Sequence, residues 1–391
     1  PRRGRGWSRW AEGRSHRAWR RLDLARSVEA DYRADMARYD TLSALDAQSL
    51  SAFDMIIDAR SPGEFAEDHL PGAVNLPVLN DEQRAEVGTL YAQVSPFEAR
   101  RKGAALVARN VAAHLEMALS DKPKSFKPLV YCWRGGMRSN SFAIILASLG
   151  WRASVVEGGY RTWRRAVIKG IERTAPGLTL VVVDGQTGAG KTALLHRLAG
   201  RGEQVVDLEG LAAHRGSAFG AEPDQPQPSQ KAFETGLWSV LAGLDPTRPV
   251  FIEAESALIG RCRIPAPLWE AMKAAPRLEV RVPAAARAAH TLETYPDMVA
   301  DHTRIEDALD RLIPLHGKAK VAEWRALAEA GDFRAFAEAL ITEHYDPAYT
   351  RARKRQHDGA AAVIEAARLD ASGLDSLADQ LMTAANRLAR S

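Results

Sequence analysis

The sequence is poor in cysteine: 391 residues contain two, Cys132 and Cys262. Two thiols cannot build the disulfide framework of a small secreted protein, so that class is excluded. The sequence contains no run of about 18 apolar residues, which is the length that a membrane-spanning helix needs. The Arg-rich start has no apolar core of a secretory signal. We therefore expect a cytoplasmic protein that does not bind membranes.

Acidic residues are scarce in one segment only. Residues 1–26 hold nine Arg against Glu12 and Asp23. Removing these from the 53 basic and 49 acidic residues of the whole chain leaves 44 and 47. The net charge of +4 therefore resides in the N-terminal segment, and we expect residues 1–40 to form a basic, disordered leader. This charge alone is weak support for a nucleic-acid partner.

The remaining chain has the composition of a soluble globular protein and the length of two or three domains. Short apolar runs at 54–59, 128–132 and 153–156 predict buried strands, separated by helical patterns at 81–120 and 139–149. This alternation predicts an α/β domain with a parallel sheet over 41–170.

A second alternating pattern follows, with strands expected at 178–183, 204–208, 249–253 and 278–282. It predicts a second α/β domain over 171–345, which the phosphate-binding motif at 184–192 makes P-loop NTPase-like, and a helical C-terminal region over 346–391.

A thiol, two glycines and two arginines follow the expected strand 128–132. Cys132 begins the run Cys-Trp-Arg-Gly-Gly-Met-Arg, and a helix is expected from Ser139. Loop amides at a helix N-terminus stabilise anions and lower a thiol pKa, so we predict that Cys132 is a catalytic thiolate. A buried structural cysteine is the simpler alternative. The residues expected to hold an anionic substrate are Arg134, Gly135, Gly136 and Arg138.

Residues 184–192 match the phosphate-binding pattern G-x-x-x-x-G-K-[ST], between an expected strand and an expected helix. Backbone amides of such a loop surround a diphosphate, and the lysine neutralises its charge. Binding does not imply hydrolysis, so a requirement for ATP stays open. A Mg²⁺ ion could accompany the phosphates at Thr192, but no set of protein metal ligands is predicted. The expected diphosphate-binding residues are Gly185, Gly188, Gly190, Lys191 and Thr192.

Further candidates for the P-loop site are Glu253, at the end of an expected strand, and three loop residues, His214, Arg215 and Ser217. Glu253 and Glu255 alternate, so at most one of them faces the site if both lie on the strand. The loop residues could contact a diphosphate or a nucleic acid, or only cap a helix.

The first domain resembles the rhodanese family over about 45–168. Sulfur-transferring rhodaneses have one residue fewer between the cysteine and the arginine than Cys132 and Arg138. The longer loop is similar to that of phosphatases with the same fold, which implies a cradle wide enough for a phosphate. The resemblance rests on Ile56–Arg60, Glu64-Phe65, His69–Pro77, the Cys132 loop and Glu157–Trp163.

A rhodanese-like domain joined to a P-loop domain resembles the tRNA 2-selenouridine synthase family. The likeness covers about 40–355. It extends to 207–220, 227–234, 252–265 and the motif His344-Tyr345-Asp346-Pro347-Ala348-Tyr349.

This resemblance implies an enzyme that replaces the sulfur of wobble 2-thiouridine in tRNA by selenium from selenophosphate. In the family, a geranyl group from geranyl diphosphate first alkylates the sulfur, and selenium then displaces geranylthiol. We expect the P-loop to hold geranyl diphosphate and the Cys132 loop to handle selenium. The partner implied is tRNA, and no stable protein partner is predicted.

A basic run follows Tyr345 and Tyr349. Basic side chains bind nucleic-acid phosphates and aromatic rings stack on exposed bases, so this run is a candidate tRNA contact. A solvated helix face is the alternative interpretation. Its basic residues are Arg351, Arg353, Lys354 and Arg355.

Two other function classes remain open at this point. One is a P-loop kinase or NTPase fused to a sulfurtransferase-like module that acts on small molecules. The other is a regulator that only binds an anion or nucleotide and would tolerate loss of the Cys132 thiol.

Overall fold

The computed structural model describes residues 39–216, 220, 225–294, 296, 302–356 and 359–388. Most of the predicted leader, residues 1–38, lies outside this range. The chain divides into two compact units, and the boundary between Arg165 and Ala166 falls within helix α7 (Tyr160–Thr174). Among the described helices, none combines the length and the apolarity that a bilayer crossing needs.

The first unit contains a five-stranded parallel sheet, which confirms the predicted fold class. All four residues of its central strand, β4 (Pro128–Tyr131), are buried. Its continuous apolar run is typical of a parallel strand that is covered on both faces. The edge strand β1 was not predicted, since three residues carry too short a pattern. In spatial order the strands are β1 (Asp40–Leu42), β5 (Ser154–Val156), β4 (Pro128–Tyr131), β2 (Met55–Asp58) and β3 (Ala73–Asn75).

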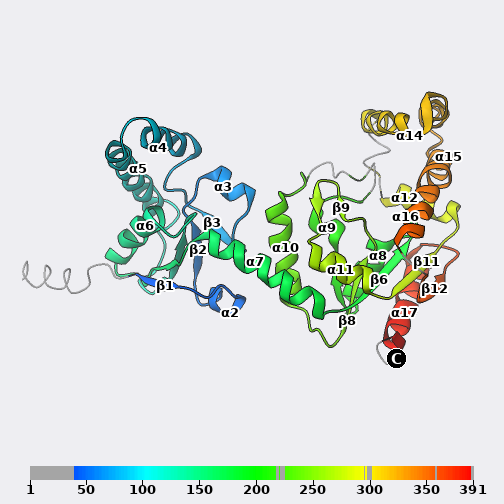
Figure 1. The fold of residues 1–391 in the computed structure, drawn as a ribbon, viewed down its shortest axis with the longest axis horizontal. Coiled ribbons are helices and arrows are strands. Elements are labelled where there is room, and N and C mark those ends of the chain that lie inside the picture. Colours follow the sequence, from blue (N-terminus) through cyan, green and yellow to red (C-terminus); the bar gives the residue numbers. More distant parts are fainter. Residues whose placement is uncertain are drawn as a thin grey trace, which may run out of the picture. The chain divides into compact units, whose positions relative to one another are not determined.

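The helices of this unit begin at residues that cap them. Asn80 accepts a hydrogen bond from the Gln83 N–H, and Ser95 accepts from the Phe97 and Glu98 N–H groups. The Ser95 cap splits the predicted helical stretch 81–120 into two helices (Figure 1). The helices are α2 (Ala47–Leu50), α3 (Pro62–Glu67), α4 (Asp81–Gln93), α5 (Pro96–Glu116) and α6 (Met137–Ser148).

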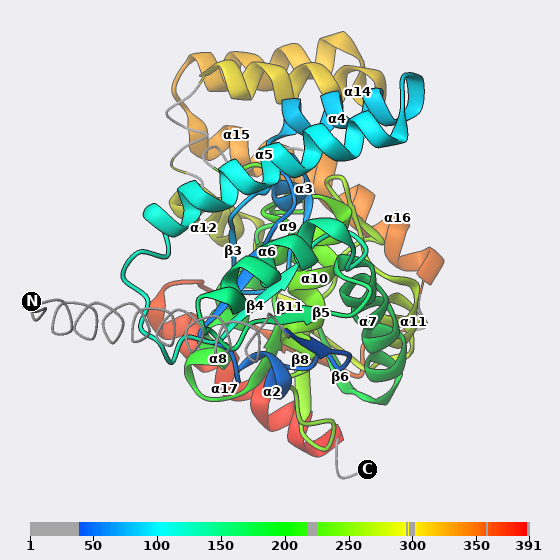
Figure 2. The ribbon, with the colours of Figure 1, turned by 90° about the vertical axis from the view of Figure 1, so that its left-hand side faces the viewer.

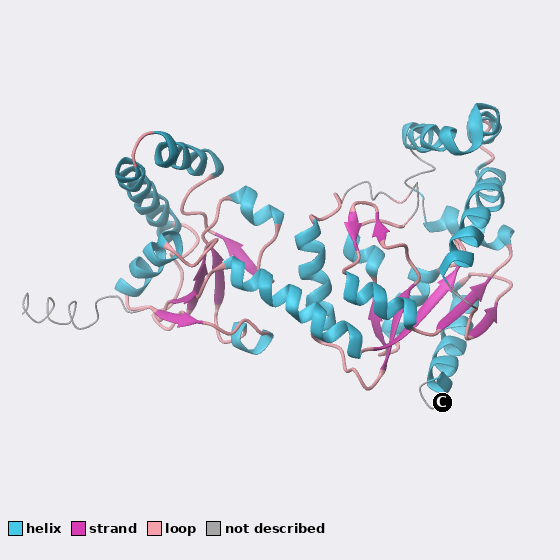
Figure 3. Ribbon diagram, viewed as in Figure 1, coloured by secondary structure: helices cyan, strands magenta, loops and turns pink. Residues whose placement is uncertain are grey.

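The second unit also has a five-stranded parallel sheet. The C-terminal region expected to be helical contributes one of its strands, Ala362–Glu365. Ile364 is buried between two exposed residues, as in a strand, and this segment pairs in parallel with the strand Arg277–Arg281. The strands in spatial order are β12 (Ala362–Glu365), β11 (Arg277–Arg281), β6 (Thr179–Gly185), β8 (Pro249–Glu253) and β7 (Gln204–Val206), with a separate hairpin of β9 (Leu258–Ile259) and β10 (Cys262–Arg263) (Figure 3).

The sheet of the second unit forms its main core with helices α8 (Lys191–Gly200) and α17 (Ala371–Leu388). Leu194 and Leu377 are fully buried in this core beside Val183 of β6. The other helices of the α/β part are η1 (Ala175–Gly177), α9 (Leu208–Ala212), α10 (Gln230–Leu241), α11 (Ala266–Ala274) and α12 (Ala284–Thr294).

A helical bundle lies between α12 and β12 in the sequence and has a core of its own. Helix α14 (His302–Glu329) reverses direction near Gly317, whose φ of +80° suits glycine. Its two halves lie side by side, and Arg325 of the second half pairs with Glu306 of the first (Figure 2). The remaining elements are α15 (Phe333–Leu340), the π-helical turn η2 (Ile341–Tyr345) and α16 (Asp346–Gln356).

Gly159 closes the turn that joins β5 to α7 beneath the Cys132 loop. Its φ is +60°, and a Cβ atom there would overlap the Cys132 carbonyl oxygen. The next residue, Tyr160, donates its backbone N–H to the same oxygen at 2.8 Å. This turn therefore fixes the backbone from which the Cys132 loop starts.

We predict that Gly159→Ala destabilises the first unit far more than Gly150→Ala. Gly150 has a φ of +85° but open space around its Cβ position, so its alanine variant should lose only about 1–2 kcal/mol of stability, through backbone strain. Gly159→Ala adds an overlap that costs roughly 1–3 kcal/mol more. Thermal unfolding followed by circular dichroism compares the two variants. Equal shifts in melting temperature would contradict the contact with Cys132.

Candidate functional sites

The first candidate site is the loop that leads from β4 into α6. Cys132 follows β4 directly, and its side chain is buried at 3% exposure. The Gly136 N–H points at Sγ from 3.4 Å, and the Ser139 hydroxyl lies 3.2 Å from Sγ. Gly135 adopts a φ of +63°, which lets the loop curl back over the sulfur. The loop therefore surrounds the thiol with hydrogen-bond donors.

These donors decide the ionisation of the thiol. Burial by itself would raise the pKa of Cys132. Hydrogen bonds from the Ser139 hydroxyl and from the Ser139 and Gly136 amides, together with the charge of Arg138, outweigh burial and lower the pKa. The site thus favours a thiolate, as a nucleophile requires. Ser139 was not singled out from the sequence, although it directly follows Arg138.

The two arginines of the loop differ in their surroundings. Arg134 is exposed. Arg138 donates to Glu64 at the N-terminus of α3, with an Nη1–Oε2 distance of 2.7 Å. Burial would raise the pKa of Glu64, but the Arg138 bond and charge, a hydrogen bond from the Ser61 N–H and the charge of Arg84 lower it. Arg138 would therefore have to exchange Glu64 for an anionic ligand before it could bind one.

The second candidate site is the P-loop between β6 and α8. Gly188 and Gly190 have φ values of +80° and +74°, which only glycine adopts readily. A Cβ on Gly188 would also lie 2.8 Å from Thr291 Oγ1 of α12. Lys191 begins α8 and donates to the Gly185 carbonyl at 3.2 Å. The loop amides and Lys191 therefore converge at one helix N-terminus, which suits a phosphate group.

Three glutamates lie beside the P-loop. Thr192 donates to Glu209 at 2.6 Å, and the Glu209 N–H donates to Glu253 at 2.8 Å. Glu253 is fully buried, and burial, reinforced by the charges of Asp207 and Glu209, raises its pKa well above the usual range. Its position is therefore beneath the site, whereas Glu255, two residues later, lines the cavity.

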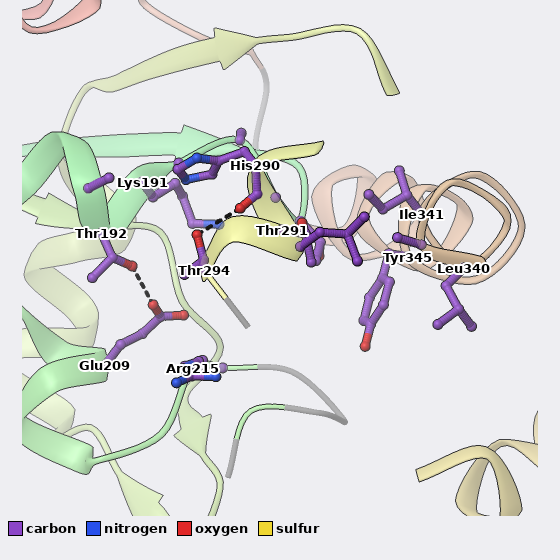
Figure 4. Close-up of a pocket in the computed structure, with 18 of the residues that line it drawn as sticks. Lys191, Thr192, Glu209, Arg215, His290, Thr291, Thr294, Leu340, Ile341 and Tyr345 are labelled. Carbon is purple, nitrogen blue, oxygen red and sulfur yellow. Dashed lines mark hydrogen bonds between the residues drawn. The ribbon is translucent and has the colours of Figure 1, made fainter. Parts of the chain in front are cut away.

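A cavity of about 200 Å³ opens from the P-loop and changes character along its length. Figure 4 shows Lys191, Thr192 and Glu209 at one end, Leu340, Ile341 and Tyr345 at the other, and Thr291 between them. The apolar part of the wall comes from α12, α14, α15 and η2, through Leu292, Ile305, Phe333, Phe336, Ala337, Leu340 and Ile341. Sequence reasoning missed this wall, because its residues come together only in the folded chain.

Sequence reasoning also did not identify Arg287, the residue that connects this wall to the P-loop. Arg287 of α12 is 3% exposed and donates to the Thr187 carbonyl at 3.0 Å. It also makes a two-pronged pair with Asp346 at 2.9 and 2.8 Å. Tyr349 donates to Asp184, just before the P-loop, at 2.9 Å. The motif 344–349 therefore serves to attach α16 to the P-loop.

The other predicted site residues are distributed as follows. Arg215 lines the cavity, and His214 Nδ1 accepts a hydrogen bond from the Gly216 N–H at 3.2 Å. Ser217 lies outside the described residues. Arg351 is exposed on α16. The side chains of Arg353, Lys354 and Arg355 are outside the described part of the structure.

Within the described ranges, no group of three or more His, Cys, Asp or Glu side chains is arranged to hold a metal ion. The acids beside the P-loop are engaged with protein groups instead: Glu209 with Thr192, and Glu253 with the Glu209 amide.

Comparisons with known proteins match both units. Residues 40–166 match the family model of the rhodanese-like domain. Residues 178–312 match the model described as the tRNA 2-selenouridine synthase AAA domain. The two matched segments contain the Cys132 loop and the P-loop, respectively.

Curated relatives carry the same family name. A protein from Nitrosomonas europaea named tRNA 2-selenouridine synthase is 38% identical over 61% of this chain and 63% of its own length. One from Aeromonas salmonicida is 39% identical over 61% and 64%. One from Cupriavidus pinatubonensis is 33% identical over 75% of this chain and 87% of its own length. The matched region is thus under two thirds of the first two relatives and most of the third.

We predict that Ser139→Ala slows alkylation of Cys132 by iodoacetamide about tenfold at pH 7. Loss of the hydroxyl removes a hydrogen bond that stabilises the thiolate, so the pKa of Cys132 rises and the reactive fraction falls. Mass mapping of the alkylated peptide separates Cys132 from Cys262. The control is Ser148→Ala at the exposed end of the same helix, which should react at the wild-type rate. An unchanged rate in Ser139→Ala would show that the Ser139 hydroxyl does not contribute to the lowered pKa of Cys132.

Proposed function

This chain belongs to the tRNA 2-selenouridine synthase family, and from that premise we propose that it replaces the sulfur of wobble 2-thiouridine in tRNA by selenium from selenophosphate. We further propose that the sulfur is first geranylated by geranyl diphosphate. The observation that carries the proposal is the cavity whose polar end is the P-loop and whose other end is apolar.

The two ends of this cavity match the two parts of a prenyl diphosphate. Amides of the P-loop and Lys191 suit the diphosphate group, which is a polyanion. Side chains such as Phe336, Leu340 and Ile341 suit a branched hydrocarbon, because burying apolar surface is favourable. The polar ribose of ATP would gain little from this wall. The lining therefore supports geranyl diphosphate over a nucleotide as the ligand.

The proposed first step is a displacement at C1 of the geranyl group. The sulfur of 2-thiouridine forms a bond to C1 while the bond from C1 to the diphosphate oxygen breaks. The P-loop amides and Lys191 stabilise the charge that builds up on the leaving diphosphate. The product carries an S-alkyl group, which leaves C2 far more readily than a thiocarbonyl sulfur does.

The proposed second step takes place with the Cys132 loop. Arg134 and the amides of Gly135 and Gly136 would hold the phosphoryl group of selenophosphate, and Arg138 would join them after releasing Glu64. Attack of the Cys132 thiolate on phosphorus would release selenide and leave a phosphocysteine, which water hydrolyses to phosphate and thiolate. Selenide then adds at C2 and expels geranylthiolate.

The tRNA itself is proposed to contact Arg351, which is exposed on α16. Asp346 and Tyr349 of the same helix bind next to the P-loop, which supports a tRNA contact near the proposed site of the first step.

We predict that the two steps separate by mutation. Incubating 2-thiouridine tRNA with geranyl diphosphate should give the geranyl mass shift in wild type and in Cys132→Ser, and selenouridine should form on adding selenophosphate only in wild type. Lys191→Met should fail in geranylation but convert tRNA that is already geranylated. Mass spectrometry of wobble nucleosides is the measurement.

Normal geranylation by Lys191→Met with failed selenation would overturn this division of labour. No modified nucleoside under any condition would overturn the proposed function. Nucleotide hydrolysis with thiosulfate or phosphoester turnover would then favour the kinase or NTPase alternative.

We also predict that Leu340→Ala weakens geranyl diphosphate binding about tenfold and leaves inorganic diphosphate binding unchanged. The variant removes part of the apolar wall, and about 1.4 kcal/mol of lost burial corresponds to this factor. Calorimetric titration measures both ligands. Leu315→Ala is the control, because Leu315 is exposed on α14 and does not line the cavity. Equal weakening of both ligands would contradict a hydrocarbon-binding wall.

A further inference from the structure

We infer that Glu255 is a catalytic acid of the prenyl-transfer step, which protonates the leaving diphosphate and shares its proton with Glu209. The inference rests on the proposed function, since it concerns the reaction in the P-loop cavity. Glu255 was considered from the sequence only as the neighbour of Glu253, and no role follows from the P-loop pattern itself.

The geometry places this pair of carboxyl groups at the polar end of the cavity. Both Glu209 and Glu255 line it together with Lys191 and Thr192. Their oxygens converge on Gly216: a Cβ there would lie 2.7 Å from Glu209 Oε1 and 2.8 Å from both carboxyl oxygens of Glu255. Glu209 also accepts a hydrogen bond from Thr192 through its other oxygen. The side chains of Glu255 and Glu209 also hydrogen-bond to each other, and a hydrogen bond between two carboxyl groups requires that one of them carry a proton.

The charged groups around Glu255 determine whether it carries that proton. Glu209 faces it from α9, Lys191 from α8, and Arg215 and His290 line the same cavity. Burial, and next the charge of Glu209, raise the pKa of Glu255 to about 8, although Lys191 acts in the opposite direction. A group with this raised pKa is protonated at neutral pH and loses its proton as the pH rises through about 8.

The reaction needs such a proton. Alkylation at sulfur turns 2-thiouracil into an isothiourea that has no hydrogen on N3, so the base loses one proton. The bond from C1 to oxygen breaks with its electron pair on the diphosphate, which takes up one proton at neutral pH. A carboxyl pair that gives its proton to the diphosphate oxygen and accepts the N3 proton balances both changes and returns to its starting state. No oxidant or other co-reactant is needed.

The test is single-turnover geranylation of 2-thiouridine tRNA at saturating geranyl diphosphate, without selenophosphate, as a function of pH. In wild type the rate should fall at alkaline pH, with a midpoint above the value of about 8 that Glu255 has without ligand, because the negative charge of the bound diphosphate raises its pKa further. Glu255→Gln should be about 100-fold slower at pH 7 and lack this alkaline fall, while binding geranyl diphosphate as wild type does. Glu255→Asp keeps a titratable group and should retain the alkaline fall at a reduced rate.

Glu270→Gln is the matched control, because Glu270 is exposed on α11 and does not line the cavity. Wild-type rate and pH profile in Glu255→Gln would overturn the inference and leave the prenyl transfer standing. A defect that disappears at higher geranyl diphosphate concentration would also overturn it, since it would mark a binding role. If wild type gives no geranylated nucleoside at any pH, the proposed function fails, and this inference fails with it.

Discussion

One buried guanidinium holds the second unit's cavity together. Arg287 is removed from water, and a buried charge is tolerated only where its donors are satisfied. It binds the Val282 carbonyl at the end of β11, the Thr187 carbonyl of the P-loop and the Asp346 carboxylate at the start of α16. Losing any one of these partners would leave a buried polar group unpaired. Arg287 therefore links the phosphate-binding end of the cavity to its apolar end, and the hydrogen bond from Tyr349 to Asp184 adds a second link.

The two units share one backbone arrangement, a strand, a loop and a helix, around sites of different chemistry. In each, a buried parallel strand runs into a glycine-containing loop that ends at a helix N-terminus: β4 to α6 in the first unit and β6 to α8 in the second. The amides of both loops stabilise negative charge. In the first, the charge would be that of the protein's own sulfur, because the loop lowers the pKa of Cys132. In the second, it would arrive with the ligand, and Lys191 meets it.

Local patterns in the sequence were sufficient to predict the α/β fold and both loops, because each loop is a short contiguous motif next to a buried strand. Strands β1 and β12 were not predicted, since their short patterns depend on pairing with β5 and β11. The partnership of Arg138 with Glu64 spans 74 residues, and that of Arg287 with Asp346 spans 59. Contacts between residues so far apart in the sequence, and a cavity wall formed by four helices, cannot be predicted from local residue patterns.

The helical bundle that supplies much of the apolar wall is one uninterrupted stretch, from α14 to η2, with its own core around Leu309, Trp324 and Phe336. The phosphate-binding loop and its acids lie in a different part of the chain, before residue 256. Under the proposed function, recognition of the alkyl group and binding of the diphosphate are thus encoded in separable segments. Mutations in the helical bundle would then reshape the space for a longer or shorter alkyl chain while leaving the P-loop and its acids untouched, so selectivity for the alkyl donor could change without loss of catalysis.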